Sequence, residues 1–254
     1  MSDSYNHLTV SQSNDVLHVT INREQKRNAL SLDVLAEIKQ AFRANADDPS
    51  LKLAVLTGAG EKCFAAGGDL KELDSVRSVD ASTEMSISAG AALDAVREFP
   101  LPVIALLNGA ALGGGAELAM ACDFRLAASH ARIGVIQGTL HITTAWGGGP
   151  DLIERIGSAP ALDLVTSARV LSAGDAVEIG VIDAVAQESL SMLLEDYSSP
   201  MLAREAHVLR AMKALRLAAK AKFTAHLREL ETELFVDCWT HEAHWEAAAK
   251  ILGK

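Results

Sequence analysis

"NGAALGGGAELAMACD", residues 108–123, is the segment that decides the fold. Three consecutive glycines, Gly113 to Gly115, run straight into an apolar stretch, and the carboxylate of Glu117 stands at the junction. Both features cost stability, because glycine loses much conformational entropy on folding and an isolated charge is rarely placed among apolar residues. The pattern indicates that the backbone lacks side chains here so that another group can come close to it, and that the carboxylate of Glu117 faces that group.

The surrounding sequence alternates strands with helices. Strand-like runs occupy residues 16–21, 51–58, 102–109, 123–129 and 132–136. A helix is expected over residues 31–42, with Ser31 as its N-cap. Its apolar face is expected to carry Leu32, Leu35, Ile38 and Phe42. Alternation of this kind predicts an α/β fold with parallel strands.

Two segments have other patterns. From about residue 196 the chain is almost continuously helical, with Leu227, Leu230, Leu234 and Cys238 at helical spacing. This predicts either a helical cap on the core or an assembly surface. Residues 71–91 are polar and weakly patterned, which predicts a mobile segment.

Composition restricts the class of protein. The chain of 254 residues has 49% hydrophobic residues and a net charge of −10, so a broad nucleic-acid surface is not expected. Its three cysteines have no C-x-x-C spacing, which argues against a disulfide framework or a thiolate zinc site. No signal peptide and no membrane-spanning run is recognised, so a cytoplasmic setting is expected.

Several motifs were tested and fail. The sequence has no P-loop, no dinucleotide fingerprint at a first strand and no G-x-S-x-G nucleophile elbow. In "HEAH", His241 and His244 are three residues apart, not the four of a zincin, so a solvent-facing helix surface is expected. A solvated helix face, with phosphate attraction as the alternative, is also expected for the basic residues Arg204, Arg210, Lys213, Arg216, Lys220 and Lys222.

Two glycine turns form the surviving pattern. "CFAAGGDL" (63–70) follows one strand and "ALGGGAEL" (111–118) follows another. Ligands of α/β proteins bind at the carboxyl ends of strands, and a helix starting near Gly115 directs unpaired N–H groups there. Two convergent backbone amides can hold a developing oxyanion, with Glu117 as an acid or base beside it. Burial would raise the pKa of Glu117 and the helix N-terminus would lower it.

The same residues resemble a known family. "FAAGGDLKEL" (64–73) and "PVIALLNGAALGGGAELAMACDFRLAASHARIG" (102–134), with the spacing between them, look like the enoyl-CoA hydratase/isomerase (crotonase) superfamily. The likeness extends from "INREQKRNALSLDVL" to "ARVLSAGDAVEIGVIDAVA", and the helical region also fits.

The resemblance implies a right-handed spiral of ββα units over residues 1–195, and a C-terminal helical region over 196–254 that builds a homotrimer or a dimer of trimers. It implies an acyl-CoA thioester as substrate, and no metal or cofactor beyond coenzyme A itself. By position, Gly68 and Gly114 supply the two amides and Glu117 is the catalytic glutamate. Adenine and pantetheine contacts map near Arg27, Ala65, Ala66 and Gly67.

The sequence departs from the family at one position. Hydratases usually present a second glutamate, and the aligned residue in "RIGVIQGTLHITTAWGGGPDLIERIG" (132–157) is Gln137. An amide can position water but cannot accept a proton at neutral pH. His141, four residues on, can titrate near neutrality, although a loop or core histidine is the simpler expectation.

Three functions follow from this departure. The first is an enoyl-CoA hydratase or 3-hydroxyacyl-CoA dehydratase in which Gln137 holds the water. The second is decarboxylation of a malonyl-type acyl-CoA, which needs mainly the oxyanion site, or double-bond isomerisation. The segment "AWGGGP" (145–150) resembles a segment of some decarboxylase-like relatives. Within it, Trp146 is expected to shape the acyl pocket. The third is a catalytically weak acyl-CoA-binding scaffold.

Overall fold

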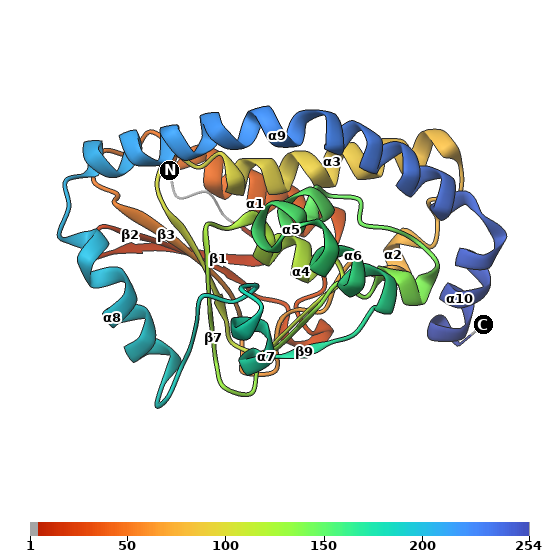
Figure 1. The fold of residues 1–254 in the computed structure, drawn as a ribbon, viewed down its shortest axis with the longest axis horizontal. Coiled ribbons are helices and arrows are strands. Elements are labelled where there is room, and N and C mark those ends of the chain that lie inside the picture. Colours follow the sequence, from red (N-terminus) through yellow and green to blue (C-terminus); the bar gives the residue numbers. More distant parts are fainter. Residues whose placement is uncertain (1–4, 254) are drawn as a thin grey trace.

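The computed structural model describes residues 5–253 and contains two sheets (Figure 1). In this part of the chain the larger sheet has the order β1 (Leu8–Ser13), β2 (Val16–Ile21), β3 (Leu53–Gly58), β5 (Val103–Leu107), β7 (Phe124–Ala127) and β10 (Ala184–Val185). The smaller sheet has the order β4 (Cys63–Ala65), β6 (Ala110–Leu112), β8 (Arg132–Gly134) and β9 (Leu171–Ser172). Neighbouring strands are parallel except in the pairs β1–β2 and β8–β9.

The two sheets are built by a repeated ββα unit. The strand pairs β3–β4, β5–β6 and β7–β8 each place one strand in the larger sheet and the next in the smaller one. The helices that follow them are α2 (Leu70–Leu73) with α3 (Val79–Arg97), then α4 (Gly114–Ala121), then α5 (Gly148–Ile156) with α6 (Ser158–Ser167). This arrangement confirms the predicted α/β fold of ββα units.

The first helix shows how the sequence makes its local structure. α1 (Leu32–Ala44) begins where Ser31 Oγ accepts a hydrogen bond of 3.3 Å from the Val34 N–H, as predicted for the N-cap. Leu35, Ile38 and Phe42 are buried as expected. Leu32 was assigned wrongly to this face: it is 36% exposed, because it stands in the first turn at the edge of the core.

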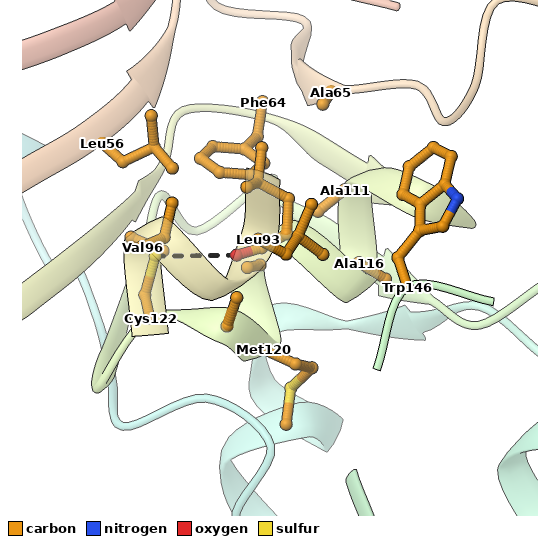
Figure 2. Packing of buried hydrophobic residues seen from close by; sticks show 14 of the residues in the cluster. Leu56, Phe64, Ala65, Leu93, Val96, Ala111, Ala116, Met120, Cys122 and Trp146 are labelled. Atoms are coloured by element: carbon orange, nitrogen blue, oxygen red, sulfur yellow. Dashed lines mark hydrogen bonds between the residues drawn. The ribbon is translucent and has the colours of Figure 1, made fainter. Parts of the chain in front are cut away.

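The core lies between the sheets and the helices that follow them. Leu56 of β3, Phe64 of β4, Leu93 of α3 and Met120 of α4 belong to one buried cluster (Figure 2). Ile133 of β8, in the third unit, belongs to the same cluster. Residues from all three ββα units therefore share one core, so the turns at the strand ends are held on a rigid base.

Residues 71–91, for which a mobile segment was expected, are mostly helical. These residues form α2 and most of α3, and Ser78 caps α3 by accepting from the Ala81 N–H at 3.1 Å. The buried face of α3 includes Ser82 and Ser86 between small apolar residues, and Ser86 Oγ donates to the Ala145 carbonyl at 2.8 Å. Because the buried face carries small and hydroxylated side chains, the sequence does not show large apolar residues at the spacing of a helix.

The C-terminal part contains α7 (Ala173–Glu178), α8 (Leu190–Leu202), α9 (Ala206–Thr240) and α10 (Glu242–Leu252). The expected division at residue 195/196 falls inside α8. Figure 1 shows α9 running along α3 across the top of the molecule. Within residues 5–253, no helix combines the length and the apolar character that crossing a bilayer requires.

The basic residues of α9 do not form the solvated face that was expected. Lys213 is 4% exposed and pairs with Asp123 at 2.5 Å, and Lys220 is 6% exposed and pairs with Asp151 at 2.6 Å. Arg210 donates to two backbone carbonyls near the end of α1. Lys222 lies outside the residues whose side chains are described. Arg210, Lys213 and Lys220 therefore anchor α9 to the core, whereas Arg204, which precedes α9, is exposed as expected.

The leucine repeat of α9 lies partly on the exposed surface of the helix. Leu230 and Leu234 are exposed, whereas Phe235 and Trp239 are buried. The expectation for "HEAH" is wrong for one residue: His244 is buried, with Nδ1 2.9 Å from the Leu140 carbonyl and its ring 4.3 Å from that of Trp239. α10 therefore packs its aromatic face against the core.

Candidate functional site

The two glycine turns lie side by side. β4 and β6 are parallel neighbours, with Ala65 opposite Ala111, so the turns that follow them leave the same edge of the smaller sheet. A Cβ atom built on Gly67 would be 3.8 Å from the Gly114 nitrogen. The structure thus brings together the two turns that the sequence singled out.

Neither of the two expected amides, those of Gly68 and Gly114, donates a backbone hydrogen bond within the described residues. Gly114 is the first residue of α4, so its N–H has no acceptor within the helix. Gly68 pairs with Leu30 through the Gly67 carbonyl and the Asp69 N–H, which turns the Gly68 N–H to the opposite side. Two donors are therefore available at adjoining positions.

The glycine triplet is required by close contacts. Gly113 has φ +53° and ψ −120°, a conformation that side-chain-bearing residues avoid. A Cβ on Gly115 would lie 2.0 Å from the carbonyl oxygen of Ala65. The triplet thus lets the start of α4 pack directly against the end of β4.

The indole of Trp146 forms a wall of the site. A Cβ on Gly114 would lie 2.2 Å from Trp146 Cζ3, and one on Gly68 would lie 3.6 Å from Trp146 Cη2. The ring therefore lies close to both amide-bearing glycines and leaves no room for a side chain at Gly114, and it is buried. Figure 2 shows it at the end of the core cluster, next to Ala116.

Glu117 projects from the first turn of α4 and is 2% exposed. Its Oε2 accepts hydrogen bonds from the N–H groups of Trp146 (2.8 Å), Gly148 (3.0 Å) and Ala145 (3.3 Å). Burial, and then the nearby carboxylate of Glu231, raise its pKa to about 8, although these amides oppose the change. Burial therefore outweighs the donors that favour the charged form, and Glu117 can act both as an acid and as a base near neutral pH.

Gln137 lies beside this carboxyl group. It begins the short 3-10 helix η2 (Gln137–Leu140), and its Nε2 donates to Glu117 Oε1 at 2.7 Å. Gln137 is buried, and its Oε1 has no hydrogen-bond partner among the described residues. An acceptor is therefore left free next to the carboxyl group.

Glu231 of α9 was not identified from the sequence. Its Oε1 accepts from Thr144 Oγ1 (2.5 Å) and from the Gly149 N–H (2.9 Å), and its Oε2 accepts from the Gly147 N–H (2.6 Å). Burial raises its pKa. One signal was available, since Glu231 is four and eight residues before Phe235 and Trp239 and therefore shares their buried face.

The remaining expected binding residues surround the first turn. The carbonyl of Arg27 accepts from the Ala66 N–H at 3.1 Å, and the carbonyl of Gly67 accepts from the Leu30 N–H at 2.8 Å. The Arg27 side chain is exposed next to this turn, and Ala65 is buried beneath it. η1 (Glu24–Lys26) leads into Arg27.

His141 is an exposed residue at the end of η2. It is not among the hydrogen-bond partners of the Glu117 oxygens, which are Gln137 and the N–H groups of residues 145, 146 and 148. Within residues 5–253, no three or more His, Cys, Asp or Glu side chains are arranged to hold a metal ion.

The geometry agrees with the comparisons with known proteins. A sequence profile of the enoyl-CoA hydratase/isomerase family matches residues 11–250. The chain belongs to this family. It is 32% identical to the crotonyl-CoA hydratase of Syntrophomonas wolfei over 252 residues, which cover 99% of this chain and 96% of the relative. It is 30% identical to the short-chain-enoyl-CoA hydratase of Clostridium acetobutylicum, over 98% and 95% of the two chains.

Solved structures confirm the crotonase fold. An enoyl-CoA hydratase/isomerase from Mycobacterium paratuberculosis superposes with a TM-score of 0.89 over 98% of this chain and 99% of that chain. Its sequence is only 21% identical, so this likeness supports the fold alone.

Proposed function

We propose that this protein is an enoyl-CoA hydratase acting on short acyl chains, and that it also catalyses the reverse dehydration. The Gly68 and Gly114 N–H groups donate to the thioester oxygen, and each such donor lowers the barrier by about 3–4 kcal/mol. Water oxygen bonds to C3, and the electrons of the C2=C3 double bond move into an enolate whose oxygen these amides hold. Glu117 accepts the proton from water and passes it to C2, so water is added overall.

The observation that carries this proposal is the pair formed by Gln137 and Glu117. Because Gln137 Nε2 is held by Glu117 Oε1, its free Oε1 is fixed beside the carboxyl group. A water donating one hydrogen to Gln137 and the other to Glu117 is then oriented for attack. One carboxyl group with a pKa near 8 serves both proton transfers, which removes the need for a second glutamate.

The rest of the site supports a coenzyme A thioester with a short acyl group. The exposed guanidinium of Arg27, beside the Ala66 turn, can bind the phosphates of coenzyme A. The indole of Trp146 lies against both Gly68 and Gly114, so it limits the acyl group next to the carbonyl. The names of the two relatives, crotonyl-CoA hydratase and short-chain-enoyl-CoA hydratase, support the same assignment. No cofactor besides the coenzyme A of the substrate is needed.

Decarboxylation of a malonyl-type acyl-CoA is the second candidate. Position 137 carries a neutral amide beside the carboxyl group of Glu117. A carboxylate on the substrate would therefore not be repelled by a second negative side chain at this position. The oxyanion amides alone would stabilise the enolate left after loss of carbon dioxide.

Turnover of three thioesters tests the proposal. Purified protein is incubated with crotonyl-CoA, a β,γ-enoyl-CoA and methylmalonyl-CoA, and hydration, isomerisation and carbon dioxide release are followed. We expect hydration of crotonyl-CoA, and a kcat lowered on the order of a hundredfold or more by Glu117→Gln. Carbon dioxide release without hydration would replace the first function by the second. Absence of all three reactions would leave an acyl-CoA-binding scaffold.

We also propose a homotrimer, or a dimer of trimers, in the cytoplasm. Exposed apolar side chains on α9, among them Leu215, Leu230 and Leu234, support burial of this helix against another copy.

A further inference from the structure

Residues 144–149 are held between two buried carboxylates that come from distant parts of the chain. Glu117 accepts from the N–H groups of residues 145, 146 and 148, and Glu231 accepts from those of residues 147 and 149 and from the Thr144 hydroxyl. The donors to the two carboxylates are interleaved along the segment, so neither carboxylate can move without displacing amides that lie next to those bound by the other.

This segment leads directly into α5, whose first residue is Gly148. The first N–H groups of a helix lack partners within the helix and carry partial positive charge. Here Glu117 and Glu231 satisfy them jointly. The backbone is fitted closely to both groups, since a Cβ on Gly148 would lie 2.3 Å from Glu117 Cγ and one on Gly149 would lie 2.8 Å from Glu231 Oε1.

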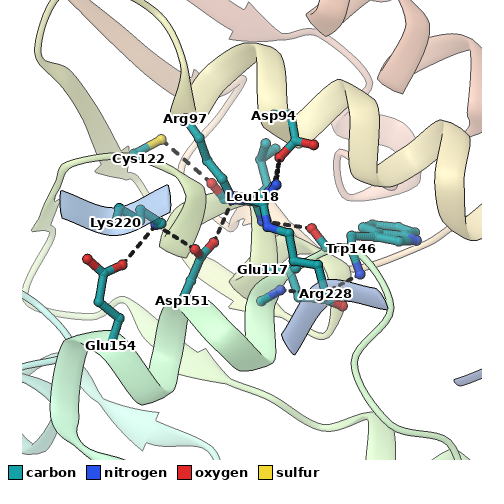
Figure 3. Close-up of polar contacts among 12 residues, drawn as sticks. Asp94, Arg97, Glu117, Leu118, Cys122, Trp146, Asp151, Glu154, Lys220 and Arg228 are labelled. Carbon is teal, nitrogen blue, oxygen red and sulfur yellow. Dashed lines mark hydrogen bonds and ion pairs between the residues drawn. The ribbon is translucent and has the colours of Figure 1, made fainter. Parts of the chain in front are cut away.

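Ion pairs fix the helix that carries Glu231. Lys213, Lys220 and Glu231 are separated by seven and eleven residues, which places them on one face of α9. Lys213 pairs with Asp123, and Lys220 pairs with Asp151 of α5, so the helix is anchored on the core and on α5. Figure 3 shows Lys220 and Arg228 of α9 on either side of the Arg97–Asp151 pair.

We propose that Glu231 is a positioning residue for Glu117, and that α9 thereby sets the position and protonation of the catalytic carboxyl group through residues 144–149. The inference rests on the proposed function for its catalytic consequence, but not for the coupling itself. Glu231 binds the segment that binds Glu117, and its charge acts on the Glu117 carboxyl group, so it affects the reaction through Glu117 and not by contact with the substrate.

The electrostatic effect has a defined direction. The negative charge of Glu231 is the second cause, after burial, of the raised pKa of Glu117. The other charged groups around the two carboxylates already have partners. Arg97 pairs with Asp94 and Asp151, Lys220 with Asp151 and Glu154, and Arg228 with Asp94. Removing the charge of Glu231 therefore lowers the pKa of Glu117, because no other fixed negative charge replaces it.

Direct titration of Glu117 tests the inference without relying on activity. Protein labelled with ¹³C at its glutamate carboxyl groups is titrated by NMR, and the Glu117 signal is assigned from its loss in Glu117→Gln. Two interacting carboxyl groups shift each other's titration, and Glu231→Gln removes one of them. In this variant we therefore expect the midpoint of the Glu117 titration to fall by about one pH unit. Glu233→Gln, with the same charge change on the exposed side of α9, should leave the midpoint unaltered.

Kinetics supply the second readout. The rising limb of the pH–kcat profile should move to lower pH in Glu231→Gln, with kcat lowered and KM little changed. An NMR shift without crotonyl-CoA hydration by the wild type would refute the proposed function but keep the coupling. An unshifted Glu117 midpoint in folded Glu231→Gln would overturn the inference.

If Glu231→Gln does not fold, Thr144→Val tests the coupling between Glu231 and Glu117. Loss of the Thr144 hydroxyl raises the pKa of Glu231, because that hydrogen bond favours its charged form. A more readily protonated Glu231 presents less charge, so the Glu117 midpoint should fall by a smaller amount. An unchanged midpoint in this variant would also overturn the inference.

Discussion

Stability should depend on pH through Glu117. Its ordinary pKa is 4.5, and in the folded protein it is about 8. Between these values the native state binds more protons than the unfolded chain, so the free energy of unfolding falls as pH rises from about 4.5 to about 8. The two pKa values differ by about 3.5, and one pH unit corresponds to about 1.4 kcal/mol, so Glu117 removes at most about 5 kcal/mol across this window.

Replacing Glu117 by Gln removes this titration. We expect the free energy of unfolding of Glu117→Gln, relative to wild type, to rise by several kcal/mol between pH 5 and pH 9. Urea unfolding at fixed protein concentration, at pH 5, 7 and 9, measures this difference. The exposed substitution Glu233→Gln controls for the loss of one charge. Parallel stability curves for wild type and Glu117→Gln would show that burial does not raise the pKa of Glu117.

Two further substitutions test the surroundings of the site. Trp146→Ala should cost about 3–5 kcal/mol, because it empties a buried aromatic site, and should raise kcat/KM for longer enoyl-CoA thioesters relative to crotonyl-CoA. Urea unfolding and a chain-length series measure the two effects, and an unaltered chain-length preference would exclude Trp146 from the acyl pocket. Lys213→Met should lower stability by about 3 kcal/mol, at the low end for a broken buried pair because Arg216 still reaches Asp123. An unchanged urea midpoint would contradict the anchoring role of this pair.

The parts of the site that could be predicted are those encoded in short stretches. Gly68 and Gly114 each follow a recognisable strand, and parallel strands present their carboxyl ends at one edge, so their proximity follows from local patterns. Gln137 was placed near Glu117 by family resemblance, and its amide is in contact with that carboxylate.

Residues that depend on distant partners were beyond local patterns. In the sequence alone, Lys213 and Lys220 have the pattern of a solvated helix face. Their burial depends on how α9 packs, because the carboxylates that neutralise them are far away in the sequence. The spacing of Glu231 to Phe235 and Trp239 marks it as buried, but its role depends on the N–H groups of residues 147 and 149, which are distant in the sequence and donate to it. α3 was missed because Ser82 and Ser86 occupy buried positions where a large apolar residue would have revealed the period.

The interleaving of the donors to Glu117 and Glu231 along residues 144–149 also bears on biosynthesis. A growing chain makes Glu117 and the segment it binds well before α9 leaves the ribosome. Until then the Gly147 and Gly149 amides lack the carboxylate that holds them in the finished molecule. The ββα core can assemble first, but the last long helix to be synthesised completes the surroundings of its proton-transferring group.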